Sequence, residues 1–129
     1  EKVFNCFNSS VENITSKNDG ILMFIKSNKL VVLLIELKSN NSKGYLKQLK
    51  AGRNFINYLL MQIDLFYSIN VQKENVLFRG ILFDTRVRKG TTQRVLHFED
   101  RNGLICTTLG CNQRYKLQTI SESIKIDYE

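Results

Sequence analysis

A run of six consecutive apolar residues, Leu30 to Ile35, constrains the fold of this 129-residue chain more than any other feature of its sequence. Successive side chains of a β-strand point to opposite faces of the sheet, so a strand that is apolar at every position is buried on both faces. Such a strand needs a layer of structure on each side of its sheet. The run therefore predicts one α/β domain, residues 1–129, with this strand in the interior of a central sheet.

The spacing of the other apolar residues predicts the elements around this strand. A short polar turn, Ser27 to Lys29, separates the strand from the apolar segment before it, so the two are expected to form a hairpin. Gly80 is expected to kink a later strand, and Asn102-Gly103 marks a tight turn. From the amino terminus, the expected elements are a helix at 3–16, strands at 21–26 and 30–39, an amphipathic helix at 45–66, and strands at 75–85, 94–100 and 104–110. The pattern after residue 114 fits neither type clearly.

The charge of the chain favours an anionic partner. Nineteen Lys and Arg residues against twelve Asp and Glu give a formal net charge of +7, and nucleic acid is the first candidate for such an excess. No apolar run reaches the roughly 18 residues that span a membrane, so no membrane partner is expected. Three cysteines without a C-x-x-C pair favour neither a disulfide framework nor a zinc site, and we expect an intracellular location, in cytoplasm or nucleus.

The apolar run ends in two charged residues that share one face of the strand, Glu36 and Lys38. A carboxylate at the end of a buried strand needs a cation or a metal ion beside it. The hairpin would bring Asp19, at the start of the preceding strand, to the same end of the sheet. Two carboxylates suit Mg²⁺, which lowers the pKa of a bound water and stabilises charge on a phosphate, while a nearby lysine can position that water.

Asp19-Gly20 followed by Glu36-Leu37-Lys38 resembles the motif of the PD-(D/E)XK nuclease superfamily, in which Asp begins one strand and Glu-x-Lys ends the next. The Pro of that motif is Asn18 here. The resemblance implies a restriction-endonuclease-like fold, a central mixed sheet flanked by helices. It further implies that Asp19, Glu36 and the backbone carbonyl of Leu37 hold Mg²⁺ or Mn²⁺, and that Lys38 positions the attacking water.

Two more residues fit places in the family pattern. Glu12 stands where an acidic residue of the first helix often completes the metal site, and Gln48 stands where several branches carry a Gln that orients water or the lysine. The resemblance covers about residues 10–65, and the second half of the chain matches no named branch. The expected contacts to the nucleic-acid backbone come from the long helix and from the loop after residue 85: Lys43, Lys47, Lys50, Arg53, Arg86, Arg88, Lys89 and Arg94.

Each of these residues also has a purely structural interpretation. Glu36 and Lys38 can form a surface ion pair, Asp19 can be a turn residue before Gly20, and the basic stripe can be a solvated helix face. We expect a metal-dependent nuclease that hydrolyses nucleic-acid phosphodiester bonds, with DNA as the first candidate substrate and RNA as the open alternative, acting as a homodimer or within a larger protein. The alternatives are a non-catalytic nucleic-acid-binding module and an interaction domain of a larger defence or replication assembly.

Overall fold

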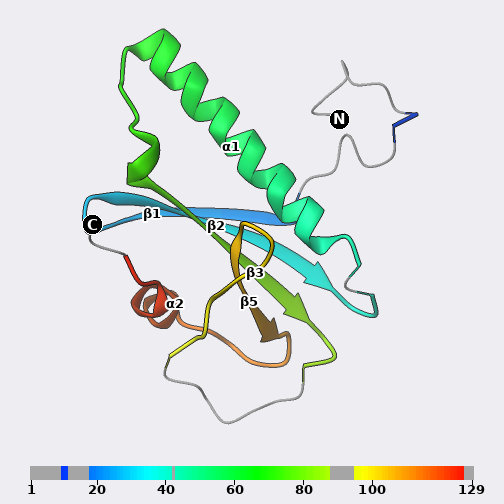
Figure 1. The fold of residues 1–129 in the computed structure, drawn as a ribbon. Coiled ribbons are helices and arrows are strands. Elements are labelled where there is room, and N and C mark those ends of the chain that lie inside the picture. Colours follow the sequence, from blue (N-terminus) through cyan, green and yellow to red (C-terminus); the bar gives the residue numbers. More distant parts are fainter. Residues whose placement is uncertain (1–9, 12–17, 42, 88–94, 127–129) are drawn as a thin grey trace.

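The computed structural model describes residues 10–11, 18–41, 43–87 and 95–126, and these form an open mixed sheet with two helices (Figure 1). Helix α1 crosses one face of the sheet and α2 lies against the other. The elements are β1 (Gly20–Lys26), β2 (Lys29–Lys38), α1 (Tyr45–Tyr67), the 3₁₀ turn η1 (Lys73–Asn75), β3 (Val76–Asp84), β4 (Glu99–Asp100), β5 (Ile105–Gly110) and α2 (Leu117–Ser123). None of the helices in the described ranges has the length and hydropathy that a membrane crossing requires.

The apolar run forms an interior strand, as its sequence predicts. The strand order is β1-β2-β3-β5-β4, with β2 antiparallel to β1 and parallel to β3, while β5 is parallel to β3 and antiparallel to β4. Val31 to Leu34 are at most 1% exposed. Val31 and Leu33 pack with Ile120 and Ile124 at α2, whereas Val32 and Leu34 pack with Leu49 and Ile56 of α1.

The turn between β1 and β2 sets which residues meet at the far end of the hairpin. Ser27 and Asn28 both have positive φ, of 48° and 60°, as a two-residue hairpin turn of the twist-matching type requires. The register then pairs Gly20 with Ile35, which brings Asp19 level with Glu36 at the end of β2. The predicted hairpin is confirmed, and its register places Asp19 beside the end of β2, as expected.

Glycine allows a close approach between α1 and the sheet. A Cβ added at Gly80 would lie 2.6 Å from Cys106 Sγ and 2.9 Å from Leu49 Cδ1. Strand β3 continues through Gly80 from Val76 to Asp84, which confirms the strand predicted at 75–85, and the kink at Gly80 stays a prediction. The glycine leaves space for Leu49, which is fully buried between α1 and the strands.

The prediction of a strand at 94–100 is wrong for most of the residues described in that range, because only Glu99–Asp100 pair with β5. The backbone N–H of Leu96 donates to Ser123 Oγ at 2.8 Å, so the chain here contacts α2 rather than a neighbouring strand. Residues 117–123, which the sequence left unassigned, form α2. The helix expected at 3–16 lies outside the described residues, apart from residues 10 and 11, which form a turn and a bend.

Candidate active site

Glu36 and Lys38 form an ion pair on the α1 face of the sheet, at the carboxyl end of β2. Lys38 Nζ lies 2.8 Å from Glu36 Oε1. Glu36 is 1% exposed, so this is not the solvated surface pair of the structural interpretation, although the lysine side chain keeps 20% of its surface exposed. A buried carboxylate with a partly exposed ammonium beside it leaves the pair open to solvent on the lysine side only.

Asp19 joins the two strands of the hairpin at this end. Its Oδ2 accepts a hydrogen bond from the backbone N–H of Leu37 at 2.8 Å. The side chain therefore fixes the end of β2 and also brings a second carboxylate close to Glu36. A carboxylate has two oxygens, so Asp19 can keep this hydrogen bond through Oδ2 and bind a cation through Oδ1.

The environment of Glu36 opposes its ionisation. Burial raises the pKa of Glu36, the hydrogen bond from Lys38 lowers it, and the nearby charge of Asp19 raises it again, so that the pKa lies above the ordinary value. Glu36 Oε2 is buried and has no hydrogen-bond partner among the described residues. A buried polar atom without a partner costs about 1–3 kcal/mol, and more for a charged group. This oxygen is a suitable ligand for a cation.

Helix α1 contacts Lys38 through the side chain of Gln48. Gln48, in the first turns of α1, accepts a hydrogen bond through Oε1 from Lys38 Nζ at 2.7 Å. The ammonium is thus held between Glu36 and Gln48, which lie on different elements. The spacing of ten residues between Lys38 and Gln48 spans the loop that carries the chain from β2 into α1, and the structure brings the two together as the family pattern suggests.

Asn18, in the place of the motif's proline, is a positioning residue that the sequence did not reveal. Its side chain is 8% exposed and its Nδ2 donates to the carbonyl oxygens of Gly20 and Ile35, the latter at 3.5 Å. It also contacts α1 at Gly52, where an added Cβ would overlap it. Asn18 therefore connects the start of β1, the end of β2 and the helix, directly before Asp19.

A second acidic residue lies beside Lys38 in the sheet. The parallel register of β2 and β3 pairs Lys38 with Asp84, which is 5% exposed. Arg86 holds its carboxylate, with Nη2 at 2.6 Å from Oδ2 and Nε at 3.0 Å from Oδ1, and lowers the pKa of Asp84 to about 2. The arginine side chain is 53% exposed, so it can still bind an anion from solvent.

The basic residues expected to contact nucleic acid divide into two groups. Lys50 and Arg53 donate to the carbonyl oxygens of Asn102 and Gly103, so they hold the turn before β5 against α1. Both side chains thus contact the protein's own backbone, and their expected contact with nucleic acid stays a prediction. Lys43, in the loop before α1, and Lys47, in the first turn of α1, are exposed. Outside the described residues lie the remaining expected contacts and one expected metal ligand: Glu12, Arg88, Lys89 and Arg94.

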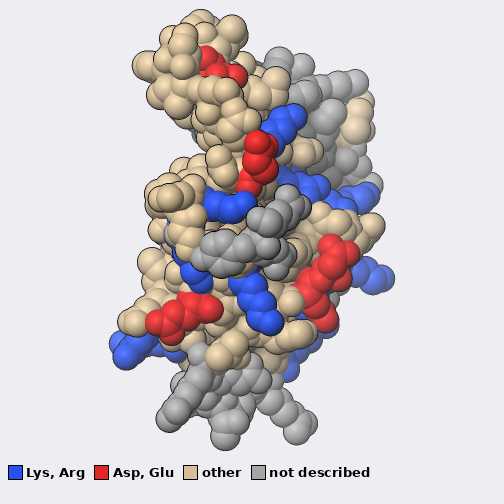
Figure 2. Space-filling view, turned by 60° about the vertical axis from the view of Figure 1, so that its left-hand side comes forward, with Lys and Arg blue, Asp and Glu red and all other residues tan. Residues whose placement is uncertain are grey.

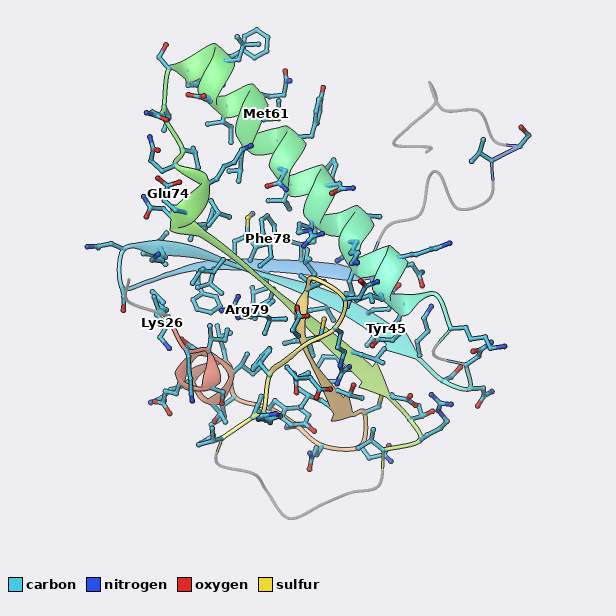
Figure 3. The ribbon with its side chains drawn as sticks, in the orientation of Figure 1. Lys26, Tyr45, Met61, Glu74, Phe78 and Arg79 are labelled. Carbon is cyan, nitrogen blue, oxygen red and sulfur yellow. The ribbon has the colours of Figure 1, made fainter. Side chains whose placement is uncertain are left out.

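Arg101 also connects the start of α1 to β4 and β5. Its Nη1 donates to Thr108 Oγ1 at 2.7 Å and to Tyr45 Oη at 3.3 Å, and its Nε donates to Glu99 Oε1 at 2.9 Å. Figure 3 shows Tyr45 at the end of α1 that lies over the carboxyl ends of the strands. The start of α1, which carries Gln48, is therefore held by three cationic side chains that bind to β4, β5 and the turn between them.

The candidate site offers a divalent cation only a few ligands from the described residues. They contain no cluster of three or more His, Cys, Asp and Glu side chains placed to hold a metal. Mg²⁺ usually takes one or two protein carboxylates and keeps several waters, so Asp19 with the unpartnered oxygen of Glu36 is a sufficient set. Comparisons with protein-family models, with curated proteins and with solved structures found no match to this chain.

Proposed function

We propose that this chain is a metal-dependent nuclease of the restriction-endonuclease-like type, which hydrolyses phosphodiester bonds of nucleic acid, with DNA as the preferred substrate. One observation carries the proposal: a buried carboxylate, Glu36, keeps one oxygen without a partner at the end of an interior strand, beside Asp19 and Lys38. A chain that needed Glu36 only for its fold would have little reason to bury an unsatisfied oxygen.

The order of elements supports the same family with one departure. The family core follows α-β-β-β-α-β, and the described residues follow β-β-α-β, with β1 and β2 before α1 and β3 after it. Within the described residues, one strand fewer therefore precedes the helix. The motif residues nonetheless occupy the expected places, with Asp19 directly before β1 and Glu36 and Lys38 at the end of β2.

Each residue of the candidate site would have its own role in phosphodiester hydrolysis. Asp19 and Glu36, with the backbone carbonyl of Leu37, would hold Mg²⁺ or Mn²⁺, which when bound activates a water and neutralises charge on the phosphate. Lys38 has three donors, of which Glu36 and Gln48 each receive one, so the third can be directed at the attacking water or at a phosphate oxygen. Gln48 keeps the ammonium in this position.

The exposed cations near the site would hold the substrate backbone. Lys43 and Lys47 at the start of α1 and Arg86 after β3 lie on segments that border the carboxyl ends of β2 and β3. Figure 2 shows Lys and Arg side chains distributed over the body of the molecule. Because these contacts are electrostatic, binding should weaken steeply as salt concentration rises.

A nucleic-acid-binding module without catalysis is the second candidate, and the net charge of +7 favours it equally. Dependence on a divalent cation separates the two functions. A binder needs no metal, and replacing one lysine at its surface should weaken binding only modestly. A nuclease should lose cleavage when Glu36 is replaced, while retaining its affinity for DNA.

The test combines cleavage with a measurement of metal binding. Plasmid and single-stranded DNA are incubated with Mg²⁺ or Mn²⁺ and with the wild type, Glu36→Gln, Lys38→Ala or the control Glu122→Gln, which alters an exposed α2 residue. We expect cleavage by the wild type and the control alone, and a metal-dependent rise in Tm that Glu36→Gln abolishes. Metal-independent DNA binding without cleavage by the wild type would overturn the proposal in favour of the binding module.

A further inference from the structure

The second half of α1 projects beyond the sheet and exposes apolar side chains. The buried residues of α1 are Leu49, Gly52 and Ile56, after which the helix continues for eleven residues, and Figure 1 shows this end standing clear of the strands. We call residues 57–69 the helix tip. Its exposed apolar residues are Tyr58, Leu59, Met61, Ile63, Leu65, Phe66, Tyr67 and Ile69. A contiguous apolar surface of this kind typically marks a protein contact.

The helix tip also differs in charge from the rest of the chain. Residues 54–72 contain no Lys or Arg and a single acid, Asp64, in a sequence with nineteen basic residues. Figure 2 shows the projecting end almost wholly in tan, with blue side chains over the body below it. Two copies of a protein with a net charge of +7 repel one another, but they can meet through this end without opposing like charges.

A groove lies beside the helix tip. It has a volume of about 540 Å³ and lies between α1 and the segment that leads into β3. Its apolar lining is Leu60, Met61, Val71, Val76 and Phe78. Figure 3 shows Met61 on α1 and Phe78 on β3, on the two sides of this space. The rest of the lining is polar and includes Arg53, Asp64 and Lys73, so one surface carries both a projection and a partly apolar groove.

We infer that the helix tip is the contact surface of a homodimer, in which Phe66 and Tyr67 of each copy enter the groove of the other. A two-fold contact uses the same surface on both copies, so that surface must be complementary to itself, and a projection next to a groove meets this requirement. Tyr58, Phe66 and Tyr67 are 56–74% exposed and together offer about 400 Å². That is about half of the roughly 800 Å² that each partner of a standard interface buries.

The inference does not depend on the nuclease proposal, and it is tested by oligomeric state alone. Sedimentation velocity of the wild type, in a concentration series that reaches about 100 µM, is compared with Phe66→Asp on the projection and Met61→Lys in the groove. Val95→Asp is the matched control, because Val95 is 70% exposed and lies outside the helix tip. Circular dichroism checks that each variant is folded.

We expect the wild type and the control to dimerise, and each helix-tip variant to raise the dimer dissociation constant by about 30-fold or more, as loss of a central aromatic contact or burial of a new charge does. A wild type that stays monomeric through the whole series would overturn the inference and point to a different protein as the partner. A dimer that both helix-tip variants leave intact would overturn it as well.

Discussion

Replacing Gly52 with alanine tests the contact that joins α1 to the candidate site. An added Cβ would overlap Asn18 Oδ1, and it would lie 2.7 Å from Asn18 Cγ and 3.2 Å from Leu34 Cδ2. Separations under 3.0 Å do not occur between such atoms, so either Asn18 or the helix must move. Asn18 cannot move without changing the hydrogen bonds that it donates beside Asp19.

The expected change in stability is the difference between opposing contributions. Alanine favours the helix over glycine by about 1 kcal/mol. Insertion of a methyl group into a filled contact costs about 1–3 kcal/mol. The two carbonyl contacts of Asn18 contribute about 0.5–1.5 kcal/mol each when they are lost. The Gly52→Ala variant should therefore be less stable than the wild type by about 1–5 kcal/mol.

Urea unfolding of a double-mutant cycle measures this effect. Asn18→Ala removes the side chain that the new methyl group would meet, so Gly52→Ala should cost far less in that background than in the wild type. We expect a coupling of about 1–3 kcal/mol between the two positions. If Gly52→Ala alone equals or exceeds the wild type in stability, α1 does not approach Asn18 as described and the reasoning is refuted.

Two further predictions concern charged residues near the site. Asp84, whose pKa is lowered to about 2 by Arg86, contributes stability that is present above its unfolded pKa of about 3.8 and is lost as the pH falls toward 2. Carbon-detected NMR titration should show the Asp84 pKa returning toward 3.8 in Arg86→Ala, and an unchanged pKa would contradict the pairing. Arg53→Ala should lower stability by about 0.5–1.5 kcal/mol in urea unfolding, because its guanidinium donates to a turn carbonyl. If Arg53 only contacted nucleic acid, stability would not change while DNA affinity fell.

Local patterns were sufficient to predict the elements that position the candidate site. The six-residue apolar run defines an interior strand, and the short turn before it fixes the register of β1 against β2. The pattern placed the turn at Ser27 to Lys29, which brings Asp19 to the end of β2 that carries Glu36 and Lys38. In the structure Lys29 already belongs to β2, and the resulting register sets Asp19 level with Glu36. Gln48 was singled out through the family resemblance rather than through local spacing, and its side chain accepts a hydrogen bond from Lys38.

The contacts that depend on the packing of distant segments could not be predicted in this way. Asp84 lies beside Lys38 only because β3 returns parallel to β2 after a helix of 23 residues, and no local pattern sets that register. Lys50 and Arg53 were expected to contact nucleic acid, and their hydrogen bonds to the turn before β5, about fifty residues away in sequence, could not be predicted from helical spacing. The alternation around Leu96 is typical of a strand, yet its N–H bonds to a side chain of α2.

The two partners of the buried ion pair should respond differently when each is replaced, and this asymmetry distinguishes function from structure. Lys38→Met would leave the Glu36 carboxylate buried without a cation, a change that costs about 3–5 kcal/mol in comparable sites. Glu36→Met would leave only a lysine that already reaches solvent and keeps its bond to Gln48, so its cost should be small or negative.

The dependence on pH sharpens this comparison. The pKa of Glu36 is raised in the folded protein, so wild-type stability falls as the pH rises from the ordinary glutamate pKa of 4.5 through that raised pKa. Glu36→Met lacks this loss and should gain on the wild type toward neutral pH in urea unfolding, whereas Lys38→Met should lose the most there. A wild type more stable than Glu36→Met at neutral pH would mean that the carboxylate serves the fold. The opposite result would mean that the chain retains a destabilising carboxylate at the end of β2, as a residue kept for binding a cation would be.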